Sequence, residues 1–116
     1  HCIAYMDEPV YDFELEKIGP LVEKYEKFPQ GVNFEIVNKK ADKYIVRVWE
    51  RGSGITLACG TGATAVAAIS KKLNLFDDVI HMNFPGGDLS CNCSNKSSIN
   101  MEGPIEYIGS GTYNIN

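Results

Sequence analysis

Residues 59–72 read Cys-Gly-Thr-Gly-Ala-Thr-Ala-Val-Ala-Ala-Ile-Ser-Lys-Lys. From Ala63 onward the run is apolar almost all round, which is typical of a helix enclosed on every side. The two lysines at its end suit the negative, carboxyl end of a helix dipole. The sequence therefore predicts a buried helix that begins near Thr61 and has Cys59 at its amino end.

The amino end of such a helix is chemically useful. Its free amide groups can hold an anion, and Gly60 and Gly62 let the backbone approach a ligand closely. Thr61 can cap the helix or donate its hydroxyl. The same field stabilises a thiolate at Cys59, which makes that residue a candidate base or nucleophile. The alternative is that Cys59 is a small buried hydrophobe packed under a tight turn.

Short runs with alternating apolar residues surround this helix. Strands are predicted at residues 2–6, 32–37, 44–49, 79–84, 89–93, 99–102 and 105–108, and an amphipathic helix over 12–25 that is broken near Gly19 and Pro20. The polar link 38–43 between two of the strands favours an antiparallel hairpin. We therefore expect an α+β fold in which a mainly antiparallel, barrel-like sheet wraps around the buried central helix.

The composition narrows the class of protein. The chain has 116 residues, 44% hydrophobic and 22% charged, and a net charge of -4 with no basic stripe, so nucleic acid is not an expected partner. The longest strongly apolar run, 63–69, is too short to cross a membrane. The four cysteines, at positions 2, 59, 91 and 93, lack metal-ligand spacing, and Cys91 and Cys93 are interpreted as structural. No metal site is predicted, and the expected setting is the reducing cytoplasm.

A longer motif carries a resemblance to a known family. Residues 49–63 read Trp-Glu-Arg-Gly-Ser-Gly-Ile-Thr-Leu-Ala-Cys-Gly-Thr-Gly-Ala, which resembles the second cysteine signature of diaminopimelate epimerases. Supporting matches are His1-Cys2 with the end of the family's N-P-H-C, Phe28-Pro29 to Val32-Asn33 with its F-P…N element, and Pro85 to Leu89 and Gly103-Pro104 with its closing motifs. Ile55 and Thr64 depart from common family residues at positions not expected to touch the reacting carbon.

The resemblance implies an enzyme of lysine and peptidoglycan-precursor synthesis that interconverts LL- and meso-diaminopimelate without pyridoxal phosphate, metal or any other cofactor. Two cysteines act on opposite faces of the α-carbon, one removing a proton while the other delivers one. By this resemblance Cys59 is the second cysteine, Glu50 helps to deprotonate it, and His1 assists the other cysteine. Gly60 and Thr61 bind the carboxylate at the reacting centre.

By the same resemblance Asn33, Glu50 and Arg51 read the distal amino and carboxylate groups. Each of these residues also has a plainer interpretation. Glu50 and Arg51 could form an exposed ion pair, Asn33 could be a turn residue, and His1 could be disordered.

The chain also lacks parts of the family pattern. It contains no C-G-N motif for the opposing cysteine, and the Asn-Pro that should precede His1 is missing. We therefore expect residues 1–116 to be the C-terminal, second domain of a two-domain epimerase whose N-terminal domain is absent. Such a piece should be inactive alone and should self-associate or bind the missing domain. The alternatives are a proline or hydroxyproline racemase and a non-catalytic fragment or small-ligand binding module.

Overall fold

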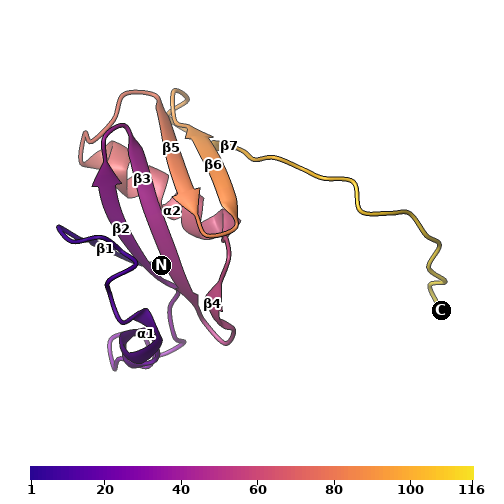
Figure 1. Ribbon diagram of the computed structural model, residues 1–116, viewed down its shortest axis with the longest axis horizontal. Coiled ribbons are helices and arrows are strands. Elements are labelled where there is room, and N and C mark those ends of the chain that lie inside the picture. The colour runs from indigo at the N-terminus through magenta and orange to yellow at the C-terminus, as the bar shows by residue number, and fades with distance from the viewer.

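The computed structural model describes residues 1–116 as seven strands and two helices. In chain order these are β1 (Cys2–Tyr5), α1 (Leu15–Glu23), β2 (Phe34–Lys40), β3 (Lys43–Glu50), β4 (Gly54–Thr56), α2 (Gly60–Lys72), β5 (Val79–Phe84), β6 (Gly87–Asn92) and β7 (Asn100–Glu102). The α+β class is as predicted, and α2 begins one residue earlier than expected (Figure 1).

All seven strands form a single mixed sheet in the order β1-β2-β3-β5-β6-β7, with the short β4 paired to β3. Four strand pairs are antiparallel, among them the predicted β2–β3 hairpin, and β1–β2 and β3–β5 are parallel. The sheet ends in two edges, β1 and β7, so these residues by themselves make an open sheet and do not close into a barrel.

Helix α2 packs on one face of this sheet, as Figure 1 shows. Its buried side, which includes Ala63, Val66 and Ala67, joins a cluster of apolar side chains from β2, β3, β5 and β6. The opposite side, with Ala65, Ala68 and Ile69, is only partly covered. The expectation of a helix enclosed on every side is thus wrong for this chain, because no second layer lies against the outer side of α2.

Helix α1 covers the other face of the sheet at the β1–β2–β3 end. Leu15 is fully buried there with Phe34 and Ile36. Gly19 lies so close to the Trp49 ring that a Cβ atom would sit 2.6 Å from it, which makes glycine necessary. The predicted break at Gly19 and Pro20 is wrong. The helix runs through Pro20, whose missing N–H removes one hydrogen bond without ending this short helix.

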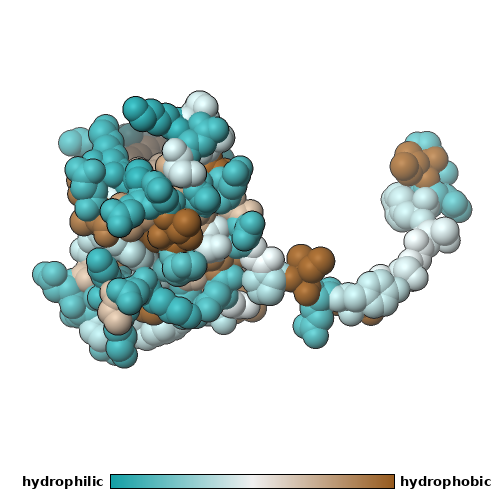
Figure 2. Space-filling view, turned by 90° about the horizontal axis from the view of Figure 1, so that it is seen from above, coloured by the Kyte–Doolittle hydropathy of each residue, from teal (hydrophilic) through white to brown (hydrophobic).

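The last fourteen residues, 103–116, leave the sheet as an extended tail (Figure 1). The strand predicted at 105–108 is not formed, because no neighbouring strand lies beside it. Ile105 and Ile108 are each 98% exposed, and Figure 2 shows the tail standing clear of the body with apolar side chains in the open. Neither helix of the fold is long and apolar enough to span a lipid bilayer.

Candidate thiol site at the amino end of helix α2

Cys59 is the N-cap of α2. Its Sγ accepts a hydrogen bond from the Gly62 amide at 3.3 Å and lies 3.5 Å from the Thr61 hydroxyl. The cap is therefore the thiol itself, and Thr61 contributes its hydroxyl instead of capping the helix. Only 7% of Cys59 is exposed. The sulfur therefore lies among hydrogen-bonding groups at the positive end of the helix.

The first helical turn also leaves backbone donors unpaired. In an α-helix the amides of the first residues have no acceptor within the helix. With Cys59 as the cap, those of Gly60 and Thr61 are in this position, whereas the Gly62 and Ala63 amides bond to Cys59. Two free donors next to a thiol form a suitable place for a carboxylate.

Glu50 ends β3 and is held by β4. Its Oε1 accepts a hydrogen bond from the Thr56 hydroxyl at 2.6 Å, and no hydrogen bond joins it to Cys59. Arg51 does not pair with it, since the Arg51 guanidinium donates to the Gln30 carbonyl at 3.0 Å. The plainer interpretation of these two residues as an ion pair is therefore wrong.

Asn33 has a defined role in the structure. Its Oδ1 accepts the Arg51 backbone N–H at 2.8 Å, so that it joins the end of β3 to the residue before β2. The register extends this link across three strands. Cys2 pairs with Phe34 and Phe34 with Trp49. The next row therefore brings together His1, Asn33 and Glu50.

His1 is bonded to a residue that the motifs did not single out. Its Nδ1 lies 2.6 Å from Oε1 of Glu35, whose side chain is fully buried in β2. Glu35 faces α2, because a Cβ atom on Gly62 would lie 2.7 Å from its Oε1 and 3.2 Å from the Cys59 Sγ. His1 is thus anchored and not disordered, and the buried carboxylate lies close to the thiol.

The environment of Glu35 is unusual for a carboxylate. Burial raises its pKa to about 7, the nearby Glu50 adds to the rise, and the α-amino group of His1 opposes it. The second oxygen, Oε2, is buried without any hydrogen-bond partner. A sequence signal for this residue did exist. Glu35 is in phase with the buried Val37 on a strand whose other side carries Phe34 and Ile36, so the alternation points a carboxylate at the core.

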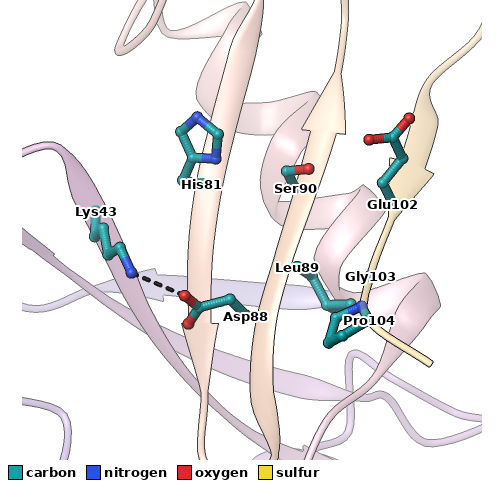
Figure 3. A pocket seen from close by; sticks show the side chains of 8 residues that line it. All are labelled: Lys43, His81, Asp88, Leu89, Ser90, Glu102, Gly103 and Pro104. Carbon is teal, nitrogen blue, oxygen red and sulfur yellow. Dashed lines mark hydrogen bonds and ion pairs between the residues drawn. The ribbon is translucent and has the colours of Figure 1, made fainter. Parts of the chain in front are cut away.

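A second polar depression lies on the sheet face away from α2, and Figure 3 shows its side chains. His81, Ser90 and Glu102 form one row across β5, β6 and β7, beside an exposed Lys43–Asp88 ion pair of 2.8 Å. No three His, Cys, Asp or Glu side chains of the chain are grouped so that they could hold a metal ion. We interpret this row as a solvated sheet face.

Comparisons with known sequences point to one family. Residues 1–108 match the family model described as diaminopimelate epimerase. Proteins named diaminopimelate epimerase from Bacillus licheniformis, a Geobacillus species and Natranaerobius thermophilus are 44%, 42% and 36% identical over 99%, 97% and 98% of this chain. The matched regions make up 41%, 40% and 39% of those proteins, so the chain spans about two fifths of their length.

Comparison with solved structures concerns the fold. A phenazine biosynthesis protein of the PhzF family from Enterococcus faecalis superposes with a TM-score of 0.58 at 12% identity, covering 78% of this chain and 32% of that one. A putative phenazine biosynthesis PhzC/PhzF protein from Clostridium difficile gives 0.58 at 17% identity, covering 79% and 33%. The same arrangement of strands and helices therefore occurs in longer proteins.

Proposed function

The chain belongs to the diaminopimelate epimerase family, and on that premise we propose that it supplies one wall of the active site of a cofactor-independent epimerase. The enzyme interconverts LL- and meso-diaminopimelate with two thiols, of which Cys59 is one. The observation that carries this proposal is the position of Cys59, whose sulfur caps α2 beside the free amides of Gly60 and Thr61. Residues 1–116 then form the second domain of the enzyme, which works in the reducing cytoplasm.

The chemistry follows from this position. The substrate carboxylate binds at the Gly60 and Thr61 amides, which places its α-carbon next to the Cys59 sulfur. One thiolate takes the α-proton, and the thiol on the opposite face delivers a proton to the carbanion, which inverts the centre. Negative charge that moves into the carboxylate is stabilised by the same amides. In the reverse direction the two sulfurs exchange roles, and no metal or cofactor takes part in either step.

The remaining site residues have supporting roles in the proposal. Glu50 accepts the Cys59 proton and is kept in place by the hydroxyl of Thr56. Arg51 and Asn33, with Glu50, bind the distal carboxylate and amino group of the substrate. Arg51 is exposed at the end of β3, where its guanidinium can turn from the Gln30 carbonyl to a carboxylate. His1 assists the thiol of the opposite face.

The opposing thiol lies outside these residues, in the missing N-terminal domain. Three surfaces are available to that domain: the β1 edge, the outer side of α2, and the apolar tail 103–116. Added strands at these surfaces would turn the open sheet into a barrel around α2. Without them we expect the isolated chain to self-associate through the same surfaces and to be inactive as an epimerase. Sedimentation of the isolated chain tests this, and a stable monomer at high concentration would contradict it.

A proline or hydroxyproline racemase is the second candidate. That reaction also needs a thiol with a carboxylate site, which the Cys59 end of α2 offers. Its substrate has no distal carboxylate, so the neighbouring Arg51 and Asn33 would have nothing to bind. A non-catalytic fragment or small-ligand binding module is the third candidate. The free amide donors beside the thiol that caps α2 favour an enzyme over a non-catalytic module.

Hydrogen exchange tests the proposal directly. In D₂O the complete enzyme should incorporate deuterium at the α-carbon of LL-diaminopimelate and epimerise it, and Cys59→Ala should reduce epimerisation by about 10³-fold or more. Cys93→Ala is the matched control, because Cys93 lies at the far end of α2, among Lys71 and Asp78, and should keep full activity. Robust turnover by Cys59→Ala would rule out its catalytic role. Turnover of proline in place of diaminopimelate would favour the racemase.

A further inference from the structure

The function proposed above assigns a role to His1 but none to its contact with the buried Glu35. Glu35 is the one carboxylate in the chain whose side chain is completely buried. Burying a charged group is costly unless other interactions compensate, and here Oε2 has no partner at all. An apolar side chain in place of Glu35 would avoid this cost, which points to a role for the carboxylate other than stability.

The only side chain hydrogen-bonded to Glu35 is that of His1. Oε1 lies 2.6 Å from the imidazole Nδ1, a short contact of the kind that charge strengthens. The His1 side chain is 26% exposed while that of Glu35 is fully buried, so the carboxylate contacts the ring from the interior of the fold. Nδ1 is committed to this contact, which leaves Nε2 as the free nitrogen of the ring.

The side of the His1 ring away from Glu35 faces a surface of the fold. The other side of His1 borders Ile3 of β1 and Ala65, Ala68 and Ile69 on the outer side of α2. This is a surface left open to the rest of the enzyme. His1 therefore lies between a buried carboxylate and the region from which the opposing thiol would approach.

We propose that Glu35 is a positioning residue that acts through His1: its carboxylate accepts a hydrogen bond from Nδ1–H and so presents Nε2 of the imidazole as a base toward the opposing thiol. This inference rests on the proposed two-thiol function. Nε2 takes the proton of the opposing S–H group, which leaves a thiolate and an imidazolium. The Nδ1–H of that imidazolium stays bonded to Glu35, and Nε2 later returns its proton to the sulfur. Atoms and charge balance, and Glu35 never touches the substrate.

Other ionisable groups lie near His1 and Glu35, and their effects have to be separated from that of Glu35. Glu50 faces Glu35 from β3, the Cys59 thiol lies on the other side of Gly62 at the start of α2, and Cys2 lies on β1. Each of them can change the charge at the site, but none is hydrogen-bonded to either nitrogen of the His1 ring. A readout at the ring nitrogens therefore isolates the contribution of Glu35.

The first test is the tautomer of His1 in the complete enzyme, read by nitrogen NMR of labelled histidine at pH 8. The proposal expects the proton on Nδ1 and a bare Nε2, and Glu35→Gln should remove this preference. A proton on Nε2 in the unaltered enzyme overturns the proposal. Because this measurement needs no activity and no variant, it remains decisive even if Glu35→Gln fails to fold.

The second test is a double-mutant cycle on kcat/KM for LL-diaminopimelate. We expect Glu35→Gln to lower kcat/KM roughly 10- to 100-fold, with KM little changed. In a His1→Asn background the same substitution should have almost no further effect, since it acts only through His1. An equal loss in both backgrounds overturns the proposal in favour of a packing role.

Exposed Glu102→Gln is the matched control for these variants and should match the unaltered enzyme. The unaltered enzyme also separates the two hypotheses. If it exchanges no α-proton of diaminopimelate, the proposed function has failed. If it does exchange while Glu35→Gln remains fully active, the role of Glu35 alone has failed.

Discussion

Two cysteines of this chain are both buried, yet their surroundings differ in kind. Cys59 is 7% exposed and meets the amide of Gly62 and the hydroxyl of Thr61 at the start of a helix. Cys91 is fully buried near the end of β6 among apolar side chains, and burial, followed by the charge of Cys93, raises its pKa to about 11. Burial among apolar side chains therefore gives an inert thiol at Cys91, whereas the Cys59 sulfur has polar groups of the first helical turn within hydrogen-bond distance.

The largest expected difference between the two thiols is in their reactivity. At pH 8 a thiol like Cys91 is ionised to roughly one part in a thousand, and it is also shielded from reagents. We expect iodoacetamide to label Cys59 at least about 100-fold faster than Cys91, measured by peptide mapping of the folded chain over time. Cys59→Ser should remove the fast phase. Equal labelling rates at Cys91 and Cys59 would show that the two thiols do not differ in reactivity.

The thiol site should also make stability depend on pH in a way that the Cys91 region does not. Glu35 has a pKa of about 7 when folded, against its usual 4.5. Between these values the folded chain binds a proton that the unfolded chain has lost, so the contribution of Glu35 to stability is fully present below 4.5 and is lost as pH rises through 7. The decrease is up to about 3 kcal/mol.

Denaturant unfolding at pH 5 and pH 8 measures this decrease. Glu35→Gln, which cannot ionise, should remove most of it and should be the more stable protein at pH 8. The same carboxylate that we propose for positioning His1 would then be a cost to the fold, as is common at functional sites. An unchanged pH dependence in Glu35→Gln would show that Glu35 is not the group responsible.

Serine substitutions compare the two thiols as structural elements. A serine in place of Cys91 buries a hydroxyl among apolar side chains and should destabilise the fold by about 1–3 kcal/mol. A serine in place of Cys59 can still accept the Gly62 amide, and serine is a good N-cap residue, so a change within about 0.5 kcal/mol is expected. Thermal unfolding of both variants measures the difference, and equal losses would contradict it.

Much of the thiol site could be predicted from the sequence because its parts are local. A helix after Cys-Gly-Thr-Gly, a thiol at its start and a hairpin ending in Glu50 all depend on neighbouring residues, and the structure has each of them. The pairing of His1 with Glu35 could not be predicted in this way. It depends on the parallel pairing of β1 with β2, which joins residues 32 positions apart and brings His1 to Glu35.

The predicted features that the structure lacks have a different cause. The apolar outer side of α2 is a pattern that predicts a covering layer, and the alternation at 105–108 is one that predicts a paired strand. In this chain the neighbour is absent, so the helix is covered on one side only and the expected strand is an open tail. The sheet is open, and does not form the predicted barrel, for the same reason. A pattern predicts which surface is to be covered but not whether the covering residues are present.

The smallest expected effect is the difference in stability between alanine substitutions at two glycines in the first turn of α2. A Cβ atom on Gly62 would lie 2.7 Å from the Glu35 Oε1 and 3.2 Å from the Cys59 Sγ, so Gly62→Ala must displace a buried carboxylate or the thiol. On Gly60 the nearest atom would be the end of the flexible Met101 side chain, at 3.2 Å. Since alanine favours helix over glycine, Gly60→Ala should be neutral or slightly stabilising.

We expect Gly62→Ala to lose about 1 kcal/mol net, because overpacking outweighs its gain in helix propensity. The melting temperature should fall by roughly 4 °C, and Gly60→Ala serves as the control for propensity. The loss should shrink when Glu35 is replaced by alanine, which removes the carboxylate that the new methyl group meets. Equal melting temperatures for the two alanine variants would mean that Glu35 and Cys59 are not held against the first turn of α2, and the contrast between the thiol site and the Cys91 region would lose its structural basis.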